Sequence, residues 1–516
     1  MANAAIDAIM PKYELIPGYK PGSNITLLNT IYIKSQKDEL GKYGMDWIYI
    51  IYKDLDTGEK KMHAIEGPTY RYYITKPEYA PQHNLFYIEA EKVRPVKCKF
   101  RDLRKSIAKE TGTIDWFMDC VRNGDFKSTD KLFELPYIFE ADLDIEDFYR
   151  FEFGRIYKND GSMSLTKAYL DIEVDTEPIG GEFPQPGQCP VNALSLVNEV
   201  DNTVYSFLLE DDTNPLIKEF KNTQGIQMEL KNFVQQAVGG WKQEKRFGLA
   251  DFKYKIIFFR DEFELIRTVF ALINNTKPDI VCCWNAAFDL PYLIARIAKL
   301  GHTPESVICH TDFPVPYVYY YIDTRAEKFE ERSDDIKITS YTVYVDQLIL
   351  FASRRKGQRM LGSYKLDTVG EFIADVHKLD YSHITRNLSK LPRLDYKTFA
   401  FYNVMDTIVQ KCIEARTTDL DFLINKSLVT NTRLSRIHRQ TTYLKNRAVS
   451  DFAGYGYVLG CNANRHNQKI PFAGAYVADP LNVSDNPKLK INNKAVGICD
   501  NLVDMDFTAM ELRPVL

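Results

Sequence analysis

The sequence lacks the features that mark several large classes of protein. Its nine cysteines include no C-x-x-C pair, which argues against a zinc site and against a disulfide framework. No apolar run approaches the length of a membrane span, and residues 1–24 lack the basic-then-apolar pattern of a secretion signal. No internal repeat or low-complexity tract is found. We therefore expect a globular chain in a reducing, cytoplasmic setting, without a membrane partner.

Acidic residues are absent from one long segment, residues 422–450, although the chain as a whole has a net charge of −4. Basic side chains there can contact DNA phosphates without reading sequence, and we single out Arg433, Arg436 and Arg439. Residues 354–359 form a second basic patch. A solvated helix face and a charged loop are the alternative interpretations of these two segments.

Three separated motifs combine acidic residues with strand or helix patterns. Asp171 and Glu173 follow the apolar run 168–170, and residues two apart on a strand point to the same side, so both carboxylates leave one face of a buried strand. Asp289 lies at a corner between the apolar strand 279–284 and a helix expected over 290–300. Tyr402 and Asp406 are four residues apart in a helix expected over 395–416, so they share one face.

Four acidic residues from three elements are typical of a two-metal nuclease. Hydrolysis of a phosphodiester can use two divalent cations about 3.5–4 Å apart, and ions such as Mg²⁺ prefer carboxylate oxygens. Each motif alone has an ordinary alternative: a helix cap for Asn285 to Asp289, and a surface pair for Tyr402 and Asp406. A second acid-x-acid copy at 144–146 lies in the acidic stretch 140–147, which we interpret as a solvated face.

Longer runs around these motifs carry a resemblance to a known family. They are Lys277-Pro278-Asp279-Ile280, Phe288-Asp289-Leu290-Pro291-Tyr292-Leu293, Ser363-Tyr364-Lys365-Leu366-Asp367 and Phe139-Glu140-Ala141-Asp142. With them, residues 137–506 resemble the 3′-to-5′ proofreading exonuclease region of family B DNA polymerases. The resemblance implies two Mg²⁺ or Mn²⁺ ions and hydrolysis of DNA from its 3′ end.

The resemblance also implies a role for each motif residue. Asp171 would bridge both metals, Glu173 and Asp406 would complete the water-activating site, and Asp289 would assist the second metal through water. Tyr402 would orient the attacking water. Asn285 and Phe288 would position the frayed 3′ strand, since single-stranded nucleic acid is commonly held by stacking and polar contacts.

The expected fold class is α/β, a mixed α+β chain of several domains. We expect a β-rich amino-terminal domain over 1–155 with a hairpin over 47–65, and an RNase H-like exonuclease domain over 156–420 with a hairpin over 193–209. The Pro-rich stretch 182–190 is expected to be a loop. A helical basic connector over 421–465 and the start of a polymerase palm over 466–516 would follow.

The carboxyl end departs from the family pattern. Residues 503–508 resemble the first palm motif, in which Asp506 would be a metal ligand, but residues 509–513 resemble the family A version, with Glu511 as a candidate sugar gate. One Asp cannot hold the two metals of nucleotide addition. We therefore expect the amino-terminal part of a split or truncated, phage-type polymerase, whose partners would be DNA, a second polypeptide and a replisome clamp. A stand-alone exonuclease and a noncatalytic DNA-holding subunit are the alternatives.

Overall fold

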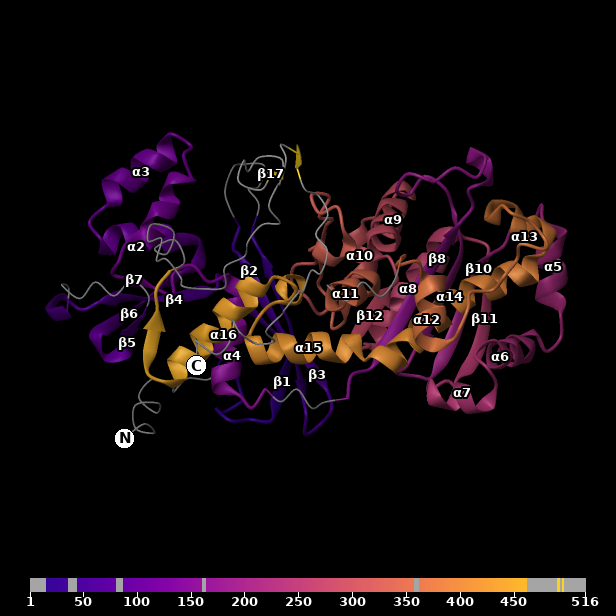
Figure 1. Ribbon diagram of the computed structural model, residues 1–516, viewed down its shortest axis with the longest axis horizontal. Coiled ribbons are helices and arrows are strands. Elements are labelled where there is room, and N and C mark those ends of the chain that lie inside the picture. The colour runs from indigo at the N-terminus through magenta and orange to yellow at the C-terminus, as the bar shows by residue number, and fades with distance from the viewer. Residues whose placement is uncertain are drawn as a thin grey trace.

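A computed structural model describes residues 15–35, 44–79, 87–159, 164–356 and 362–461, and the backbone of 490–491 and 494–495. The described chain forms an elongated body, with a small sheet of residues 69–75, 93–99 and 138–139 at one end, the sheet formed within residues 25–66 near the middle, and a six-stranded sheet toward the other end (Figure 1). Asp506 and Glu511 lie outside the described residues, as does most of the expected palm segment. There only β17 (Lys490–Ile491) and β18 (Lys494–Ala495) are assigned, as an antiparallel pair.

The amino-terminal part combines two small sheets with helices. Strand β2 (Trp47–Asp54) pairs antiparallel with β3 (Lys60–Glu66), which confirms the predicted hairpin. The other elements are β1 (Ile25–Ile33), β4 (Thr69–Thr75), β5 (Tyr87–Glu89), β6 (Val93–Lys99), β7 (Ile138–Phe139), α2 (Leu103–Glu110), α3 (Ile114–Arg122) and α4 (Ile145–Ile156). Lys60 of β3 forms an ion pair of 2.8 Å with the buried Asp279, so this part is joined to the six-stranded sheet.

The six-stranded sheet has the order β11-β10-β9-β8-β12-β15. Strands β8, β9 and β10 form an antiparallel meander, whereas β12 and β15 continue the sheet parallel to β8. The bounds are β8 (Lys167–Val174), β9 (Val191–Asn198), β10 (Thr203–Leu209), β11 (Lys253–Phe259), β12 (Ile280–Cys283) and β15 (Val343–Asp346). The predicted hairpin over 193–209 and the mixed α/β, RNase H-like fold class are confirmed, and residues 182–190 form a loop as expected.

Helices cover both faces of this sheet. On one face, Ala168, Leu170 and Ile172 of β8 pack with a cluster that includes residues of α8 and α9, and on the other Tyr169 packs with residues of α14. The helix predicted over 395–416 is α14 (Tyr396–Thr417). The remaining elements are α5 (Pro215–Asn222), α6 (Ile226–Ala237), α7 (Trp241–Arg246), α8 (Glu262–Thr276), α9 (Ala286–Lys299), α10 (Pro304–Ile308), β13 (Val318–Tyr321), β14 (Asp335–Ile338), α11 (Gln347–Arg354), α12 (Leu366–Ala374) and α13 (Leu391–Leu394).

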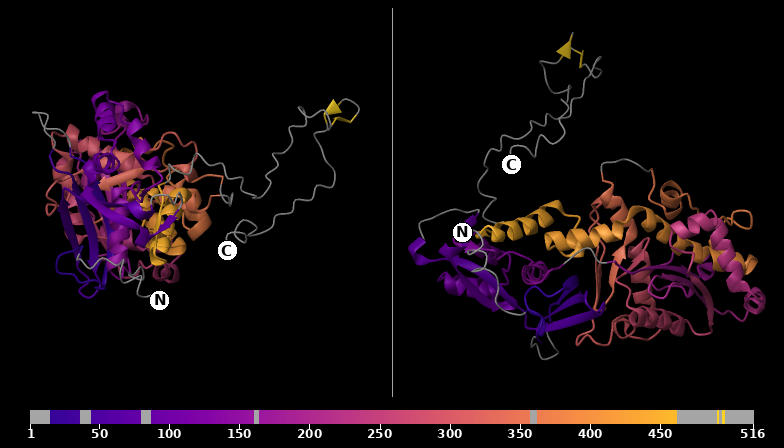
Figure 2. Two further views of the ribbon diagram at one scale, coloured as in Figure 1. Left: turned by 90° about the vertical axis from the view of Figure 1, so that its left-hand side faces the viewer. Right: turned by 90° about the horizontal axis from the view of Figure 1, so that it is seen from below.

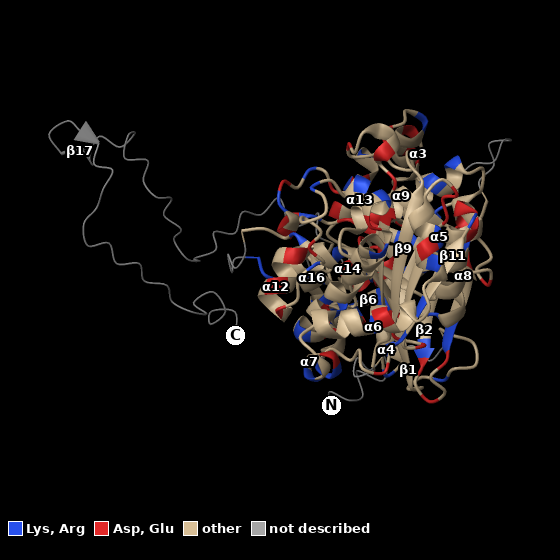
Figure 3. Cartoon of the chain, turned by 90° about the vertical axis from the view of Figure 1, so that its right-hand side faces the viewer, with Lys and Arg blue, Asp and Glu red and all other residues tan. Residues whose placement is uncertain are grey.

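After α14 the chain returns toward the amino-terminal part. Helices α15 (Asp419–Thr430) and α16 (Gln440–Gly454) run along one side of the body (Figure 2), and β16 (Tyr457–Leu459) pairs antiparallel with β5. The expected helical connector is therefore packed against the domain that opens the chain. Lys, Arg, Asp and Glu are interspersed over the end of the body that Figure 3 presents.

The interpretation of residues 140–147 as a solvated face is wrong. Glu146 is 1% exposed and forms ion pairs with Lys337 at 2.6 Å and Arg433 at 3.3 Å. Arg433 also contacts Asp144 at 2.8 Å. Burial alone would raise the pKa of Glu146, but the two neighbouring cations lower it. This acidic stretch therefore joins distant parts of the chain through ion pairs inside the protein, and we call it the internal junction.

Candidate active site

Strand β8 places two carboxylates on the face of the sheet that α14 covers. Its apolar residues Leu170 and Ile172 pack on the opposite face, so the two-residue period of a strand directs Asp171 and Glu173 toward α14. This is the arrangement expected from the sequence. Because β8 lies inside the sheet, its backbone is fixed by hydrogen-bonded neighbours on both sides.

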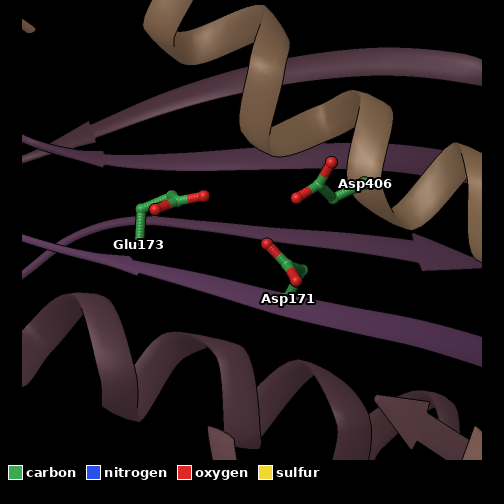
Figure 4. Close-up of side chains that lie close together, drawn as sticks. All are labelled: Asp171, Glu173 and Asp406. Carbon is green, nitrogen blue, oxygen red and sulfur yellow. The ribbon is translucent and has the colours of Figure 1, made fainter. Parts of the chain in front are cut away.

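Helix α14 brings Asp406 to the same place. One carboxylate oxygen from each of Asp171, Glu173 and Asp406 lies within 4.8 Å of the other two, and the three side chains point toward one another (Figure 4). Asn403, one turn earlier, donates a 3.0 Å hydrogen bond from Nδ2 to Oδ2 of Asp171. The carbonyl oxygen of Asn403 accepts a 2.7 Å bond from the hydroxyl of Ser195 on β9. These contacts fix the helix to the sheet at the level of the carboxylates.

Asp289 supplies a further buried charge. It lies in the first turn of α9, which begins at Ala286, so it is inside the helix rather than at the corner before it. It is 5% exposed and does not belong to the group of three oxygens within 4.8 Å of one another. Burial raises its pKa well above the ordinary value, and the charges of Asp346, Glu173 and Asp406 raise it further.

Burial and mutual repulsion raise the pKa values of the carboxylates when no metal ion balances them. Burial and the negative charges of Asp406, Asp289 and Glu173 raise the pKa of Asp171 well above its usual range. Burial and Asp406 raise the pKa of Glu173 to about 8. Burial raises the pKa of Asp406 to about 6, although a neighbouring lysine opposes the change. Like charges gathered in a poorly solvated site are costly unless cations compensate them.

That lysine is Lys378, which the sequence analysis missed. Its Nζ lies 2.6 Å from Oδ2 of Asp406 and 4.7 Å from the ring centroid of Tyr402. Its backbone N–H donates a 2.8 Å hydrogen bond to Asp367, and Tyr381 packs edge-on against Tyr402 with 5.3 Å between centroids. Asp406, Tyr402 and Asp171 raise the pKa of Lys378 well above its usual value despite the opposing effect of burial, so this side chain is a cation at the site.

The three-carboxylate group fits a hard divalent cation. Its donors are all oxygen atoms, as Mg²⁺ and Mn²⁺ prefer. Within the described part of the chain, Oδ1 of Asp406 is buried and has no hydrogen-bond partner, so its lone pairs are available to a cation. A buried acceptor without a partner is costly, and a bound cation would remove that cost.

Comparison with known proteins identifies this region. Residues 169–369 match the family described as DNA polymerase family B, exonuclease domain. This part of the chain is consistent with a family B polymerase exonuclease domain. The chain is also 24% identical over 207 residues to the DNA polymerases of Autographa californica nuclear polyhedrosis virus and Bombyx mori nuclear polyhedrosis virus. Each alignment covers 35% of this chain and 20% of the relative, so the chain spans about a fifth of the length of these curated relatives.

Residues that follow the matched range contribute to the same group of side chains. Lys378, Tyr402 and Asp406 all follow residue 369, yet they meet Asp171 and Glu173 at one place. Tyr402 is 8% exposed, and burial followed by the charge of Asp406 raises its pKa, so its phenol is neutral.

No helix in the described ranges has the length and apolar character needed to cross a bilayer.

The residues expected to contact DNA lie in different surroundings. Asn285 is exposed just before α9, and half-buried Phe288 packs against the exposed ring of Phe183 with 5.3 Å between centroids. Arg433 is committed to its ion pairs with Asp144 and Glu146. Arg436 is partly buried in a cleft that Asp142 and Asp147 also line, whereas Arg439 is exposed. A DNA contact by each of these residues stays a prediction.

Proposed function

We propose that this chain is a metal-dependent 3′-to-5′ exodeoxyribonuclease that removes nucleotides from single-stranded DNA ends. The observation that carries the proposal is the meeting of Asp171, Glu173 and Asp406, from a central strand and a covering helix, in an exonuclease domain of family B type. When bound, two Mg²⁺ or Mn²⁺ ions would activate water and stabilise the charge on the leaving oxygen. Nucleotide addition and a partner polypeptide stay predictions, because Asp506 lies outside the described residues.

The residues of the site have distinct parts in this proposal. Asp171, Glu173 and Asp406 hold the cations, and Asp289 supports the second one from α9. Asn403 orients Asp171 through its hydrogen bond. The neutral phenol of Tyr402, on the same helix face as Asp406, donates a hydrogen bond that positions the attacking water. Lys378 neutralises one negative charge and is placed to pair with a phosphate oxygen of the substrate.

A cleft beside Glu173 suits the terminal bases of a frayed strand. It has a volume of about 330 Å³ and is lined by the rings of Phe183, Phe288 and Phe399 as well as by Glu173. Aromatic rings hold single-stranded nucleic acid by stacking that does not depend on sequence, as a general exonuclease needs. The noncatalytic alternative, a DNA-holding subunit, gives no reason for a group of carboxylates with raised pKa values next to this cleft.

The test is the double variant Asp171→Asn, Glu173→Gln, assayed with Mg²⁺ on single-stranded DNA labelled at its 5′ end. The cations supply several kcal/mol of transition-state stabilisation, so we expect a rate loss of about 10³-fold or more. Glu219→Gln with Asp212→Asn is the matched control, because it removes two exposed carboxylates that do not line the cleft beside Glu173 and should keep the wild-type rate. Equal rates in the two double variants would contradict the site, and shortening from the 5′ end would contradict the direction.

A further inference from the structure

A second cleft, separate from the carboxylate site, lies between α11, α15 and the segment that leads into α16. Its volume is about 850 Å³, within the range of sites that enclose ligands of nucleotide size. None of its lining residues belongs to the carboxylate group. The lining combines four basic side chains with two aromatic rings: Arg354, Lys356, Lys426, Arg439, Phe422 and Tyr443.

The rings and cations of this cleft are in contact. The Nζ of Lys426 lies 3.9 Å from the ring centroid of Tyr443 and 5.9 Å from that of Phe422. The guanidinium of Arg354 also contacts Phe422, at 3.9 Å from its ring centroid. Phe422 is nevertheless 42% exposed, so part of its ring is accessible to a ligand. Positive groups beside available rings are the pattern that binds single-stranded nucleic acid.

The charges of the cleft do not balance internally. Its four Lys and Arg side chains outnumber its two carboxylates: Glu331 pairs with Lys356 at 3.3 Å, and Glu330 accepts a 2.7 Å hydrogen bond from Tyr364. Arg354 pairs with Asp419 below the cleft. Within the described ranges, neither Lys426 nor Arg439 forms an ion pair. The charge of Arg439 helps to lower the pKa of Asp323, but Asp323 forms its ion pair with Arg325, at 3.3 Å.

Lys426 and Arg354, which both contact the ring of Phe422, repel each other. Burial and this repulsion lower the pKa of Lys426. Burial followed by the charge of Lys426 lowers the pKa of the adjacent His438 to about 4, so the imidazole adds no charge at neutral pH. An anion in the cleft would relieve the repulsion, and a phosphodiester chain would bring several anions at once.

We propose that this cleft is a second DNA site, which holds a single-stranded segment away from the exonuclease centre. Lys426, Arg439 and Arg354 contact phosphates, while Phe422 and Tyr443 stack with bases. Arg433, which the sequence analysis grouped with Arg439, does not take part because its guanidinium is held by Asp144 and Glu146. The site is independent of hydrolysis, so it can be tested whether or not the chain is an exonuclease.

The test measures binding of a fluorescent oligothymidylate to the full chain in EDTA, in the Asp171→Asn, Glu173→Gln background. We compare Lys426→Gln with Arg439→Gln against a control that also removes two charges, Lys242→Gln with Lys245→Gln on exposed residues of α7. Each phosphate contact to a single strand contributes about 0.7 to the slope of log K against log salt. The cleft variant should therefore bind about 10-fold or more weakly at about 0.1 M salt, with a slope smaller by about 1.4.

Two further arms identify the ligand and the part played by the rings. Phe422→Leu should weaken binding about 5-fold or more while leaving the salt slope unchanged, because stacking carries no counterion release. Thymidine monophosphate should compete only at far higher concentration than the oligonucleotide. Equal losses in the cleft and α7 variants would overturn the proposal, as would a monophosphate that binds as tightly as the oligonucleotide.

Discussion

Replacing Lys378 by methionine should destabilise the protein when no divalent cation is present. The ammonium lies 2.6 Å from Asp406 and faces a group of carboxylates that nothing else in the described contacts neutralises. Removal of one partner of a buried ion pair costs about 3–5 kcal/mol. The side chain of Lys378 is 25% exposed and that of Asp406 is 5% exposed, so water relieves part of this cost and we expect about 3 kcal/mol.

The loss should be visible as melting in EDTA, and Mg²⁺ should reverse it. A cation at 100 times its dissociation constant stabilises the folded state by about 2.7 kcal/mol. The stabilisation by Mg²⁺ should be larger in Lys378→Met than in the wild type, because the lysine no longer competes for Asp406. Equal Mg²⁺-induced shifts in the two proteins would refute the idea that Lys378 occupies part of the cation site.

Lys397→Met is the matched control for this experiment. It removes a lysine from a 2.8 Å ion pair with Glu229, but both side chains there are about half exposed, at 49% and 46%. Exposed pairs contribute about 0–1 kcal/mol, so this variant should melt close to the wild type in EDTA. If Lys378→Met melts no earlier than Lys397→Met, the reasoning from buried charge is wrong.

Three further substitutions test separate parts of the site and its support. Tyr402→Phe keeps the edge-on contact with Tyr381 but removes the hydroxyl. The rate of hydrolysis should therefore fall about 10–100-fold with little change in the melting temperature. An unchanged rate would show that the Tyr402 hydroxyl does not position the attacking water. Phe183→Ala removes a ring that is 79% exposed, so it should weaken single-strand binding by about 1–3 kcal/mol in an anisotropy titration without loss of stability. Arg433→Met leaves Glu146 without one of its two cations and should lower the free energy of unfolding by about 3 kcal/mol. A loss below about 0.5 kcal/mol would show that Lys337 alone neutralises Glu146.

Local sequence patterns predicted which side chains share a face of β8 or α14, and where the hairpins form. The alternation in β8 placed Asp171 and Glu173 on one face, and the four-residue spacing placed Tyr402 and Asp406 together on α14. Both predicted hairpins were confirmed because turn residues and strand patterns lie within a few positions of each other. The amino-terminal part is less purely β than expected, since α2, α3 and α4 pack beside its sheets.

Interactions between distant residues were beyond the sequence analysis. The acidic stretch 140–147 is buried because Lys337 lies 191 positions after Glu146 and Arg433 lies 287 positions after it, and no local pattern announces such partners. Lys378 is a single lysine in a loop, and only the packing of α12 against α14 brings it to Asp406. The basic segment 422–450 was likewise treated as a single DNA-binding surface. In the structure Arg433 is held in an ion pair with Asp144, whereas Arg439 is exposed to solvent.

Charge balance connects the two sites that the structure presents. At the carboxylate site Lys378 is the one cation that acts on Asp171, Glu173 and Asp406 among the described contacts, and Asp289 adds a fourth negative group, so the pKa values of the carboxylates rise. At the second cleft the imbalance has the opposite sign, because four Lys and Arg side chains line it with only two carboxylates, and Lys426 and Arg354 repel each other. An excess of buried negative charge selects divalent cations, and an excess of positive charge beside exposed rings selects phosphates and bases. The proposed exonuclease would hold a strand at the second cleft and hydrolyse its end at the carboxylate site.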